Sequence, residues 1–324
     1  MFIKNVLVAI VILILLFLAT EFFLILYVNN TGLTRFSNNT LLLDEFIPGK
    51  EQSLFGANVK INSKGLRDYE YSYEKPDNIF RIVAIGDSFT FGHGIELNET
   101  YIKQLEKKLN QNSSLRYEVI NFGFPAYNVL QNYEMMKSRA LRFNPDLIML
   151  GYFLNDPEFI PGMNPLIQYC KENKSVIDEL NINIFEKSKI VRFLIRYYTT
   201  FVYEKKIAEF GIGYFDYINS EKYLGWNCTK KIFNQINLLS KRNNIPVLLI
   251  IIPHYDVQMS TYERIVNLSK KNGFYVLNFH TYFLNISDEE VYTKNDKPHF
   301  NREGNKIISD SIYDFLKKER KKLI

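Results

Sequence analysis

The stretch Arg81–Thr90, with the sequence RIVAIGDSFT, decides the fold of this 324-residue chain. Its first half is a short apolar run rich in β-branched residues, which is typical of a buried strand. Gly86 ends the run, and Ser88 follows two positions later. Open α/β sheets keep their ligand crevice at the carboxyl ends of the strands, so Ser88 is a candidate nucleophile. A nucleophilic serine needs a base and an oxyanion hole from elsewhere in the chain.

Strand and helix patterns alternate along the chain after this first strand. Apolar runs of strand length recur four times, and amphipathic segments of helix length lie between or after them. The expected strands are 81–85, 117–121, 146–151, 247–252 and 274–279, and the expected helices are 99–110, 132–142 and 304–317. Alternation of this kind predicts a three-layer α/β/α fold with a mostly parallel five-stranded sheet.

Two segments break this alternation. Residues 29–80 are turn-rich, and we interpret them as a stalk and lead-in to a domain that spans 81–324. Within them Asn62–Asp68 is expected to be a loop, and we assign it no role. Residues from 157 to about 229 are aromatic and polar and contain Trp226. We expect them to form an insertion over the crevice that acts as a lid or shapes the substrate site.

The N-terminus is apolar over a length that suits a bilayer. Val6–Thr20 is apolar except for its last residue, and after Glu21 the apolar run resumes through Val28. Together these runs give roughly the 20 residues that a membrane-spanning helix needs. Lys4 precedes them, which places the amino end in the cytoplasm and the domain outside.

A cleaved signal peptide is the alternative for this segment. Its apolar part would normally be about 7–15 residues long and be followed by an A-x-A site. The run here is longer, and no such site follows it. We therefore expect residues 1–28 to be an uncleaved, single-pass transmembrane anchor.

Composition excludes some classes of function. The net charge is +5 and rests partly on the tail 317–322, with no basic stripe interleaved with aromatics, so we expect no nucleic-acid partner. Cys170 and Cys228 are the two cysteines, and neither lies in a CxxC motif or has zinc-ligand spacing. We expect no metal and no cofactor. The cysteines could form one disulfide outside the cytoplasm or remain two buried thiols.

Polar or small residues stand near the ends of the other expected strands. Gly123 follows the second strand, where a small residue lets a backbone N–H face a ligand. Asn155 follows the third strand, and its side-chain amide can donate to an oxyanion. Asp296 precedes His299 by three residues, so the carboxylate could hold one ring nitrogen while the other faces a serine.

These four blocks resemble the SGNH (GDSL-like) hydrolase family. Gly86-Asp87-Ser88-Phe89-Thr90, Gly123, Asn155-Asp156 and Asp296-x-x-His299 stand in the family's order, from about residue 80 to the C-terminus. The resemblance implies an SGNH or flavodoxin-like fold. It also implies roles: Ser88 is the nucleophile, His299 is the base and acid, and Asp296 orients His299.

The resemblance further implies an oxyanion hole made of the N–H groups of Ser88 and Gly123 and the side chain of Asn155. Losing one such donor typically costs about 10²–10³ in rate. The family often places glycine where this chain has Phe153, two residues before the asparagine. This departure concerns the local backbone more than the chemistry.

Each of these residues also has a structural interpretation. Ser88 could cap a helix, Gly123 could serve a turn, and Asn155 could cap the turn before a proline. Two further histidines must be considered as residues of the site. His93 lies near the serine turn and could line the pocket, although a surface position is the favoured expectation. His254 follows the fourth strand but lacks the Asp-x-x-His arrangement, so it is a weaker candidate base than His299.

The sequence predicts a membrane-anchored bacterial esterase that forms an acyl-Ser88 intermediate. The resemblance suggests an acetyl ester of an envelope or exported carbohydrate as the substrate. Water as the acceptor would give an esterase, and a sugar hydroxyl would give a carbohydrate O-acetyltransferase. A lysophospholipase or thioesterase and a non-catalytic envelope scaffold are the remaining alternatives.

Overall fold

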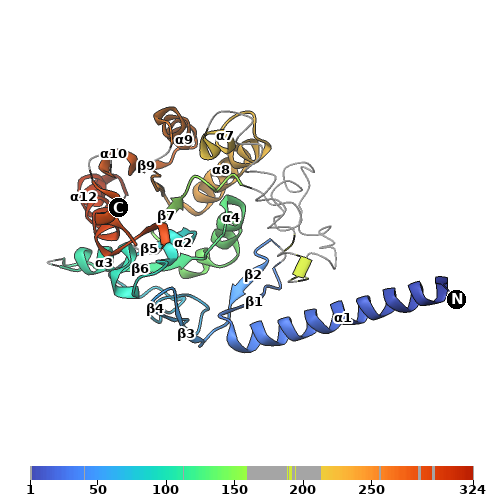
Figure 1. Ribbon diagram of the computed structural model, residues 1–324. Coiled ribbons are helices and arrows are strands. Elements are labelled where there is room, and N and C mark those ends of the chain that lie inside the picture. The colour runs from blue at the N-terminus through green and yellow to red at the C-terminus, as the bar shows by residue number, and fades with distance from the viewer. Residues whose placement is uncertain are drawn as a thin grey trace.

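The computed structural model describes residues 2–39, 41–111, 113–158, 188, 190–191, 194, 213–254, 257–283, 286–293 and 296–323. A compact body carries one long helix that projects from it (Figure 1).

Five parallel strands form the central sheet, in the order β6-β5-β7-β8-β9. They are β5 (Ile79–Gly86), β6 (Arg116–Gly123), β7 (Leu147–Tyr152), β8 (Val247–Ile251) and β9 (Tyr275–Asn278). The strands are almost continuously apolar because helices cover both faces of the sheet. The expected fold class and all five expected strands are confirmed, with the serine turn at the carboxyl end of β5.

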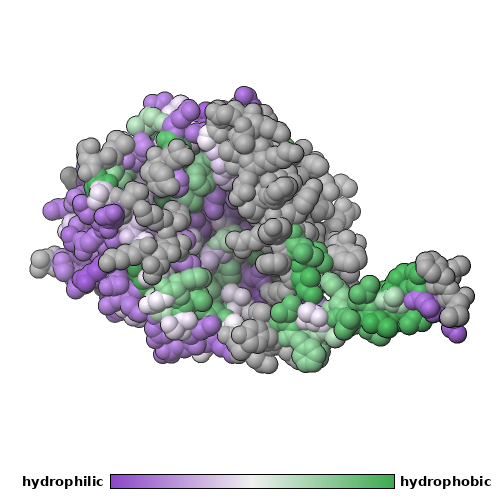
Figure 2. All heavy atoms as spheres, in the orientation of Figure 1, coloured by the Kyte–Doolittle hydropathy of each residue, from purple (hydrophilic) through white to green (hydrophobic). Residues whose placement is uncertain are grey.

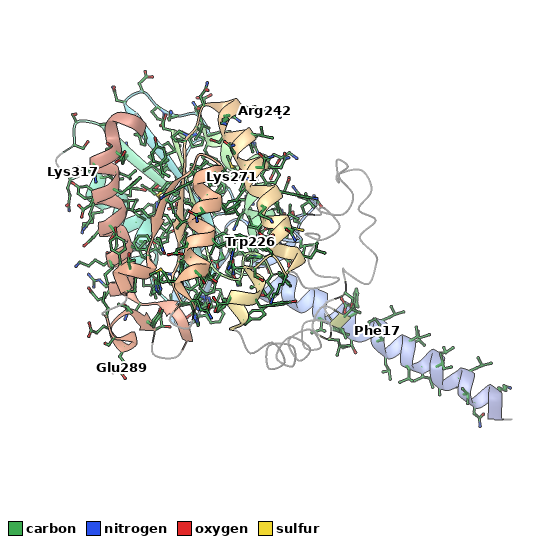
Figure 3. The ribbon with its side chains drawn as sticks, turned by 90° about the horizontal axis from the view of Figure 1, so that it is seen from above. Phe17, Trp226, Arg242, Lys271, Glu289 and Lys317 are labelled. Atoms are coloured by element: carbon green, nitrogen blue, oxygen red, sulfur yellow. The ribbon has the colours of Figure 1, made fainter. Side chains whose placement is uncertain are left out.

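Helices form a layer on each face of the sheet. One apolar cluster joins the sheet to α4 (Val129–Ser138), α8 (Leu224–Asn243) and α9 (Met259–Lys271). The other cluster joins it to α3 (Tyr101–Leu109) and α12 (Arg302–Leu323). Figure 3 shows α8 and α9 beside one another, marked by Trp226 and Lys271. Successive side chains of a strand point to opposite faces of the sheet, so each apolar strand contributes to both clusters. The three-layer arrangement follows from this.

Shorter elements complete the described chain. The helices are α2 (Ser88–Phe91), α7 (Tyr214–Ile218), α10 (His280–Phe283) and α11 (Asp288–Val291), and the 3₁₀ turns are η1 (Leu97–Glu99) and η2 (Ala140–Phe143). Strands β10 (Tyr292–Thr293) and β11 (Asp296–Phe300) form a hairpin next to α12. The expected helices 99–110, 132–142 and 304–317 are present with boundaries shifted by a few residues.

The segment before the sheet differs from the expected stalk. It forms two antiparallel hairpins, β1 (Thr34–Phe36) with β2 (Asp44–Phe46) and β3 (Glu51–Leu54) with β4 (Ala57–Lys60). Side chains of this segment are buried in the same cluster as α4 and α8, including Leu42 and Ile61. Residues 32–80 are therefore part of the domain, and strands of three or four residues are too short for a periodic signal.

The insertion expected at 157–229 lies mostly outside the described residues, so its function as a lid stays a prediction. At its end, α8 begins at Leu224 and packs on the sheet. Trp226, which was expected in the insertion, is 1% exposed within this helix. The same helix carries Cys228, which is buried and disulfide-bonded, and the only other cysteine of the sequence is Cys170.

Helix α1 (Phe2–Thr31) projects from the body as a column of apolar side chains (Figure 2). Its section Lys4–Leu24 is long and apolar enough to cross a membrane, a test that a signal sequence also passes. The Glu21 carboxylate accepts hydrogen bonds from the Ser188 hydroxyl at 3.0 Å and from the Ile190 N–H at 3.1 Å. These bonds satisfy the one acidic group of an otherwise apolar helix.

Gly123 sets how closely the end of β6 approaches α2. A Cβ atom at this position would lie 2.1 Å from the backbone nitrogen of Phe91 and 2.5 Å from the carbonyl carbon of Thr90. No side-chain rotation relieves a clash with backbone, so the glycine is required here for packing.

We expect Gly123→Ala to lower the free energy of unfolding by an amount at the upper end of the roughly 1–3 kcal/mol typical of overpacking. Because α2 must shift, any activity that depends on Ser88 should fall as well. Urea denaturation and steady-state kinetics measure both effects. Gly49→Ala is the control for activity: its Cβ would meet no atom within 4 Å, although the φ of +75° strains an alanine there. It should therefore lose some stability and keep activity. Wild-type stability and activity in Gly123→Ala would contradict the packing assignment.

Candidate active site

Ser88 begins the four-residue helix α2 directly after β5. Asp87 is the N-cap residue, and its Oδ1 accepts a hydrogen bond from the Phe89 N–H at 3.0 Å. The capping function therefore belongs to Asp87 and leaves the Ser88 hydroxyl free for other bonds. Gly92, with a φ of +84°, ends the helix in the left-handed region. The GDSFT motif thus folds as a strand, a cap and one helical turn.

The Ser88 hydroxyl is paired with His299. The distance from Ser88 Oγ to His299 Nε2 is 2.7 Å, although the two residues are 211 positions apart in the sequence. His299 lies on β11, and its ring packs against Phe89 with centroids 5.1 Å apart. A serine hydroxyl in hydrogen-bond contact with an imidazole is the arrangement that nucleophilic catalysis by serine would need.

His93 also belongs to the site, in contrast to the expected surface position. Its ring stacks on that of His299, with centroids 4.2 Å apart and planes 21° apart. His93 and Phe89 therefore both contact the His299 imidazole and limit its rotation.

His254 does not act as the partner of Ser88. It follows β8, where its backbone N–H donates to the Tyr262 hydroxyl at 2.8 Å. Its ring lies against Phe215, at a centroid distance of 4.8 Å. The imidazole bonded to Ser88 is that of His299.

Asp296 lies on the same short strand as His299, since β11 spans Asp296–Phe300. Its backbone pairs with Thr293 of β10. Its side chain is outside what the structure describes. The orienting role of Asp296 therefore stays a prediction.

Gly123 does not offer a free N–H to a ligand. Its N–H donates to Oδ1 of Asn121 at 2.8 Å, and the residue is buried. Ala126 lies three residues further along the same loop, exposed and with a φ of +65°. Among the described residues, the Ala126 N–H has no hydrogen-bond acceptor. The loop after β6 therefore presents a different donor from the one that the motif predicts.

Ser88 and Asn155 keep donors that suit an oxyanion. The Ser88 N–H opens a helix and has no acceptor among the described residues, as expected for a first-turn N–H. Asn155 is partly buried after β7, and its side-chain amide bonds to no described residue. The carboxylate of Asp156 accepts the Phe153 N–H at 2.8 Å and fixes this turn. Phe153 has no positive φ, so the turn does not need the family's glycine.

Two buried acids lie beneath the serine turn. Asp87 and Asp156 are 4% and 1% exposed and have no salt-bridge partner among the described residues. Burial raises the pKa of Asp87 to about 7. Burial and the nearby charge of Asp87 raise the pKa of Asp156 well above its ordinary range. Protonation of these acids limits the negative charge beneath the place where an oxyanion would form.

Arg67 is a positioning residue that the sequence analysis missed. Its buried guanidinium donates to the carbonyl oxygens of Gly92 at 2.5 Å, Ile95 at 2.6 Å and Phe91 at 3.2 Å. It also stacks over the Phe91 ring. These carbonyls end α2 and begin the next loop, so Arg67 holds the far side of the serine turn.

Asp68 extends the same connection to β6. One carboxylate oxygen accepts the Asn121 N–H at 2.7 Å, and the other pairs with the Lys103 ammonium at 2.7 Å. The segment Asn62–Asp68 therefore links the N-terminal hairpins to the end of α2 through Arg67 and to β6 through Asp68. The sequence of this loop has no periodic pattern, so it could not predict these hydrogen bonds, which form only in the tertiary structure.

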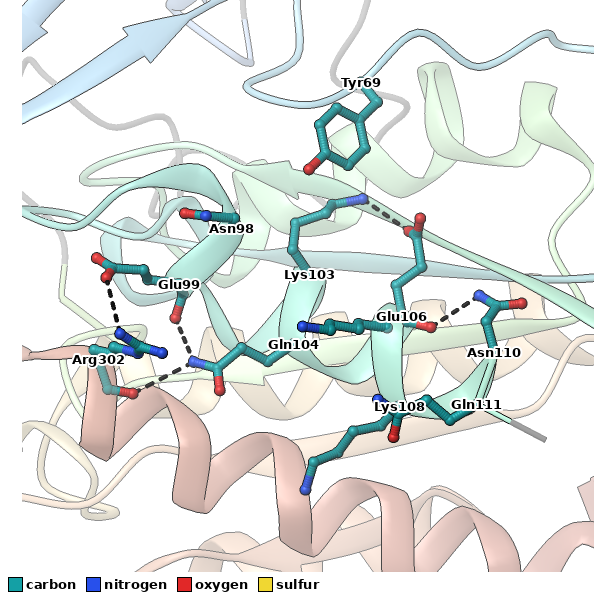
Figure 4. Close-up of a pocket in the computed structure, with 11 residues that line it drawn as sticks. Tyr69, Asn98, Glu99, Lys103, Gln104, Glu106, Lys108, Asn110, Gln111 and Arg302 are labelled. Carbon is teal, nitrogen blue, oxygen red and sulfur yellow. Dashed lines mark hydrogen bonds and ion pairs between the residues drawn. The ribbon is translucent and has the colours of Figure 1, made fainter. Parts of the chain in front are cut away.

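A separate cavity of about 560 Å³ runs along the outer side of α3 (Figure 4). Four of its charged side chains form two pairs, Lys103 with Glu106 at 2.9 Å and Arg302 with Glu99 at 3.9 Å. It is lined by none of the predicted site residues. Among the described residues, no group of His, Cys, Asp or Glu side chains could hold a metal ion.

Comparisons with known proteins give distant structural neighbours. No protein-family model and no curated protein matches the sequence. A lipolytic protein of the G-D-S-L family from Desulfitobacterium hafniense is 16% identical, with a TM-score of 0.43 over 72% of this chain and 98% of its own. An acetyl xylan esterase is 18% identical, with a TM-score of 0.45 over 73% and 100%.

A catalytic mutant of an acetylxylan esterase from Geobacillus stearothermophilus is 11% identical, with a TM-score of 0.44 over 74% of this chain and 93% of its own. We therefore base the assignment of function on the site itself.

The raised pKa of Asp87 predicts how the free energy of unfolding changes with pH. Between the ordinary value of 3.8 and about 7, the folded protein holds a proton that the unfolded chain has released. The contribution of this carboxyl to the free energy of unfolding therefore falls as pH rises through that range. Asp87→Asn keeps a capping oxygen and cannot ionise.

We expect the free energy of unfolding of Asp87→Asn, relative to wild type, to rise from pH 4 to pH 7 and then level off. Urea denaturation of both proteins across this range measures the difference. A difference that is constant with pH, or that falls, would show that Asp87 does not hold the proton.

Arg67→Lys should lower both stability and kcat. Lysine keeps the charge but cannot reach the same set of carbonyls, and each buried carbonyl left unpaired costs about 1–3 kcal/mol. Urea denaturation and the kcat of ester hydrolysis are the measurements. Arg35→Lys is the matched control, because its pair with Glu45 is exposed and worth at most about 1 kcal/mol. Equal behaviour of the two variants would contradict the positioning role of Arg67.

Proposed function

We propose that the protein is an SGNH-type serine hydrolase that cleaves or transfers an acyl ester through an acyl-Ser88 intermediate. The 2.7 Å contact between Ser88 Oγ and His299 Nε2 carries the proposal. The contact joins two motifs that only the fold brings together, at the carboxyl end of a parallel sheet where ligands bind. Both members of the pair are partly exposed, so an ester can reach them.

In the first half-reaction, His299 Nε2 takes the proton of the Ser88 hydroxyl as Oγ attacks the ester carbonyl carbon. The tetrahedral intermediate collapses, the ester C–O bond breaks, and His299 returns the proton to the departing alcohol. In the second half-reaction, His299 takes a proton from water or another hydroxyl as that oxygen attacks the acyl-Ser88 carbonyl carbon. The bond from the carbonyl carbon to Ser88 Oγ then breaks, and His299 returns the proton to Oγ, which frees the acid or the new ester. Asp296 would hold the other ring nitrogen of His299 and stabilise its imidazolium form.

We assign the oxyanion hole to the N–H of Ser88, the side-chain amide of Asn155 and the N–H of Ala126. The first two follow from the motif. Ala126 replaces Gly123, whose N–H donates to Asn121. Donors fixed in place before reaction are worth far more than solvent water to a developing oxyanion.

We further propose that the domain lies outside the cytoplasmic membrane on a single-pass anchor, in a bacterial envelope. The apolar surface of α1 and Lys4 at its start support this orientation. The disulfide-bonded Cys228 is also typical of an oxidising compartment. The substrates within reach are then envelope or exported molecules, and we propose an acetyl ester of a carbohydrate.

The same chemistry leaves the acceptor open. A sugar hydroxyl in place of water would make the protein an O-acetyltransferase, and a preference for long acyl chains would make it a lysophospholipase or thioesterase. A non-catalytic scaffold would not need the Ser88 and His299 pair.

Rapid mixing with an aryl acetate tests the intermediate. We expect a burst of aryl alcohol close to one equivalent of enzyme, and mass spectrometry of the quenched protein should show acetyl on Ser88. Ser88→Ala should lose the burst and reduce turnover by a factor of about 10³ or more. Ser114→Ala, an exposed loop serine, is the control and should behave as wild type.

Parallel reactions with acetylated glycans and with phospholipids identify the acyl donor, and added oligosaccharide separates transfer from hydrolysis. A folded Ser88→Ala variant that keeps the burst would overturn the assignment.

A further inference from the structure

We propose that the tip of the β3–β4 hairpin forms a carbohydrate-binding wall of the active site, with Phe55 stacking on a sugar ring of the ester substrate. The proposal rests on the acyl-transfer function above and names the part of the substrate that this wall binds.

A column of three rings connects Phe55 to the catalytic serine. The Phe55 ring lies against His93, with centroids 3.8 Å apart. His93 stacks on His299 at 4.2 Å, and His299 Nε2 lies 2.7 Å from Ser88 Oγ. One face of Phe55 is therefore occupied by His93 while the side chain remains 60% exposed. The open part of the Phe55 ring is thus available to a substrate that extends from Ser88 past His299 and His93.

The backbone at the hairpin tip is unfavourable for phenylalanine. Phe55 and Gly56 have φ angles of +54° and +87°, the pattern of a two-residue type I′ turn. Asn-Gly and Asp-Gly are the preferred pairs in such turns, because a bulky residue at positive φ is strained. The chain thus tolerates both backbone strain and an exposed large apolar ring at one position. Such outliers gather where a site needs a particular side chain.

The hairpin tip is fixed relative to the catalytic residues. The Asn58 carbonyl accepts a bond from Arg67, the residue that also holds the end of α2. The Asn58 N–H donates to the carboxylate of Glu96 at 2.8 Å, in the loop that follows His93. Phe55 is therefore placed by the same contacts that place Ser88.

The surroundings of Phe55 favour a sugar over an acyl chain. The nearby side chains of Glu51, Asn58 and Glu96 are exposed carboxylates and an amide, with Asn58 Nδ2 donating to Glu51 at 2.7 Å. A pyranose has an apolar C–H face that suits a flat aromatic ring and hydroxyls that suit polar neighbours. Long acyl chains need an enclosed apolar lining, which an exposed ring with a polar rim does not provide.

The test compares two substrates on Phe55→Ala and Phe55→Trp. The first substrate is a chemically acetylated xylo-oligosaccharide, and the second is a small aryl acetate that cannot reach the hairpin tip. We expect the ratio of kcat/KM for the oligosaccharide to that for the aryl acetate to fall about 5- to 10-fold in Phe55→Ala, mainly through KM. Phe55→Trp should restore the ratio. Tyr69→Ala, another exposed aromatic, should leave it unchanged.

An unchanged ratio in folded Phe55→Ala would overturn the proposal, as would a selective loss on long-chain acyl esters. If the wild type cleaves no ester, the proposed function fails, but sugar binding by the wall can still be tested. Calorimetric titration with the same oligosaccharide should then show binding to the wild type that weakens in Phe55→Ala. Equal or absent binding in the two proteins would overturn it.

Discussion

The close backbone contact between α2 and the ends of the sheet strands governs the rest of this structure. The nucleophile sits on one helical turn, which has too few internal bonds to hold itself. Three glycines at the ends of β5, β6 and β7 let that turn approach: a Cβ on Gly86 or Gly151 would meet Thr90, and one on Gly123 would meet the backbone of Phe91 and Thr90. Arg67 closes the opposite side. The position of Ser88 is therefore set by packing.

Much of this could be predicted from the sequence, because the informative signals are local. The apolar runs predicted the five strands, and the motif order predicted the pairing of Ser88 with His299. What escaped prediction depends on tertiary contacts. Gly123 was expected to present its N–H, but the fold uses its missing side chain for packing and gives its N–H to Asn121.

The N-terminal segment is a second part of the chain whose structure depends on tertiary contacts and was not predicted from the sequence. Its strands are too short for a periodic pattern, so it was expected to be a stalk. It instead buries Arg67 against α2 and brings Phe55 to the ring column of His93 and His299. The hairpins and the strand ends around Ser88 therefore share one core, and the proposed substrate wall lies in the part of the chain that the motifs do not cover.

Active-site labelling tests the central claim most directly, because it needs no knowledge of the substrate. The full-length protein is treated with a fluorophosphonate, digested and mapped by mass spectrometry. The account predicts one modified residue, Ser88, with labelling lost in His299→Ala although that variant remains folded. Labelling at another residue, or undiminished labelling of Ser88 without His299, would contradict the claim that this pair forms the nucleophilic centre.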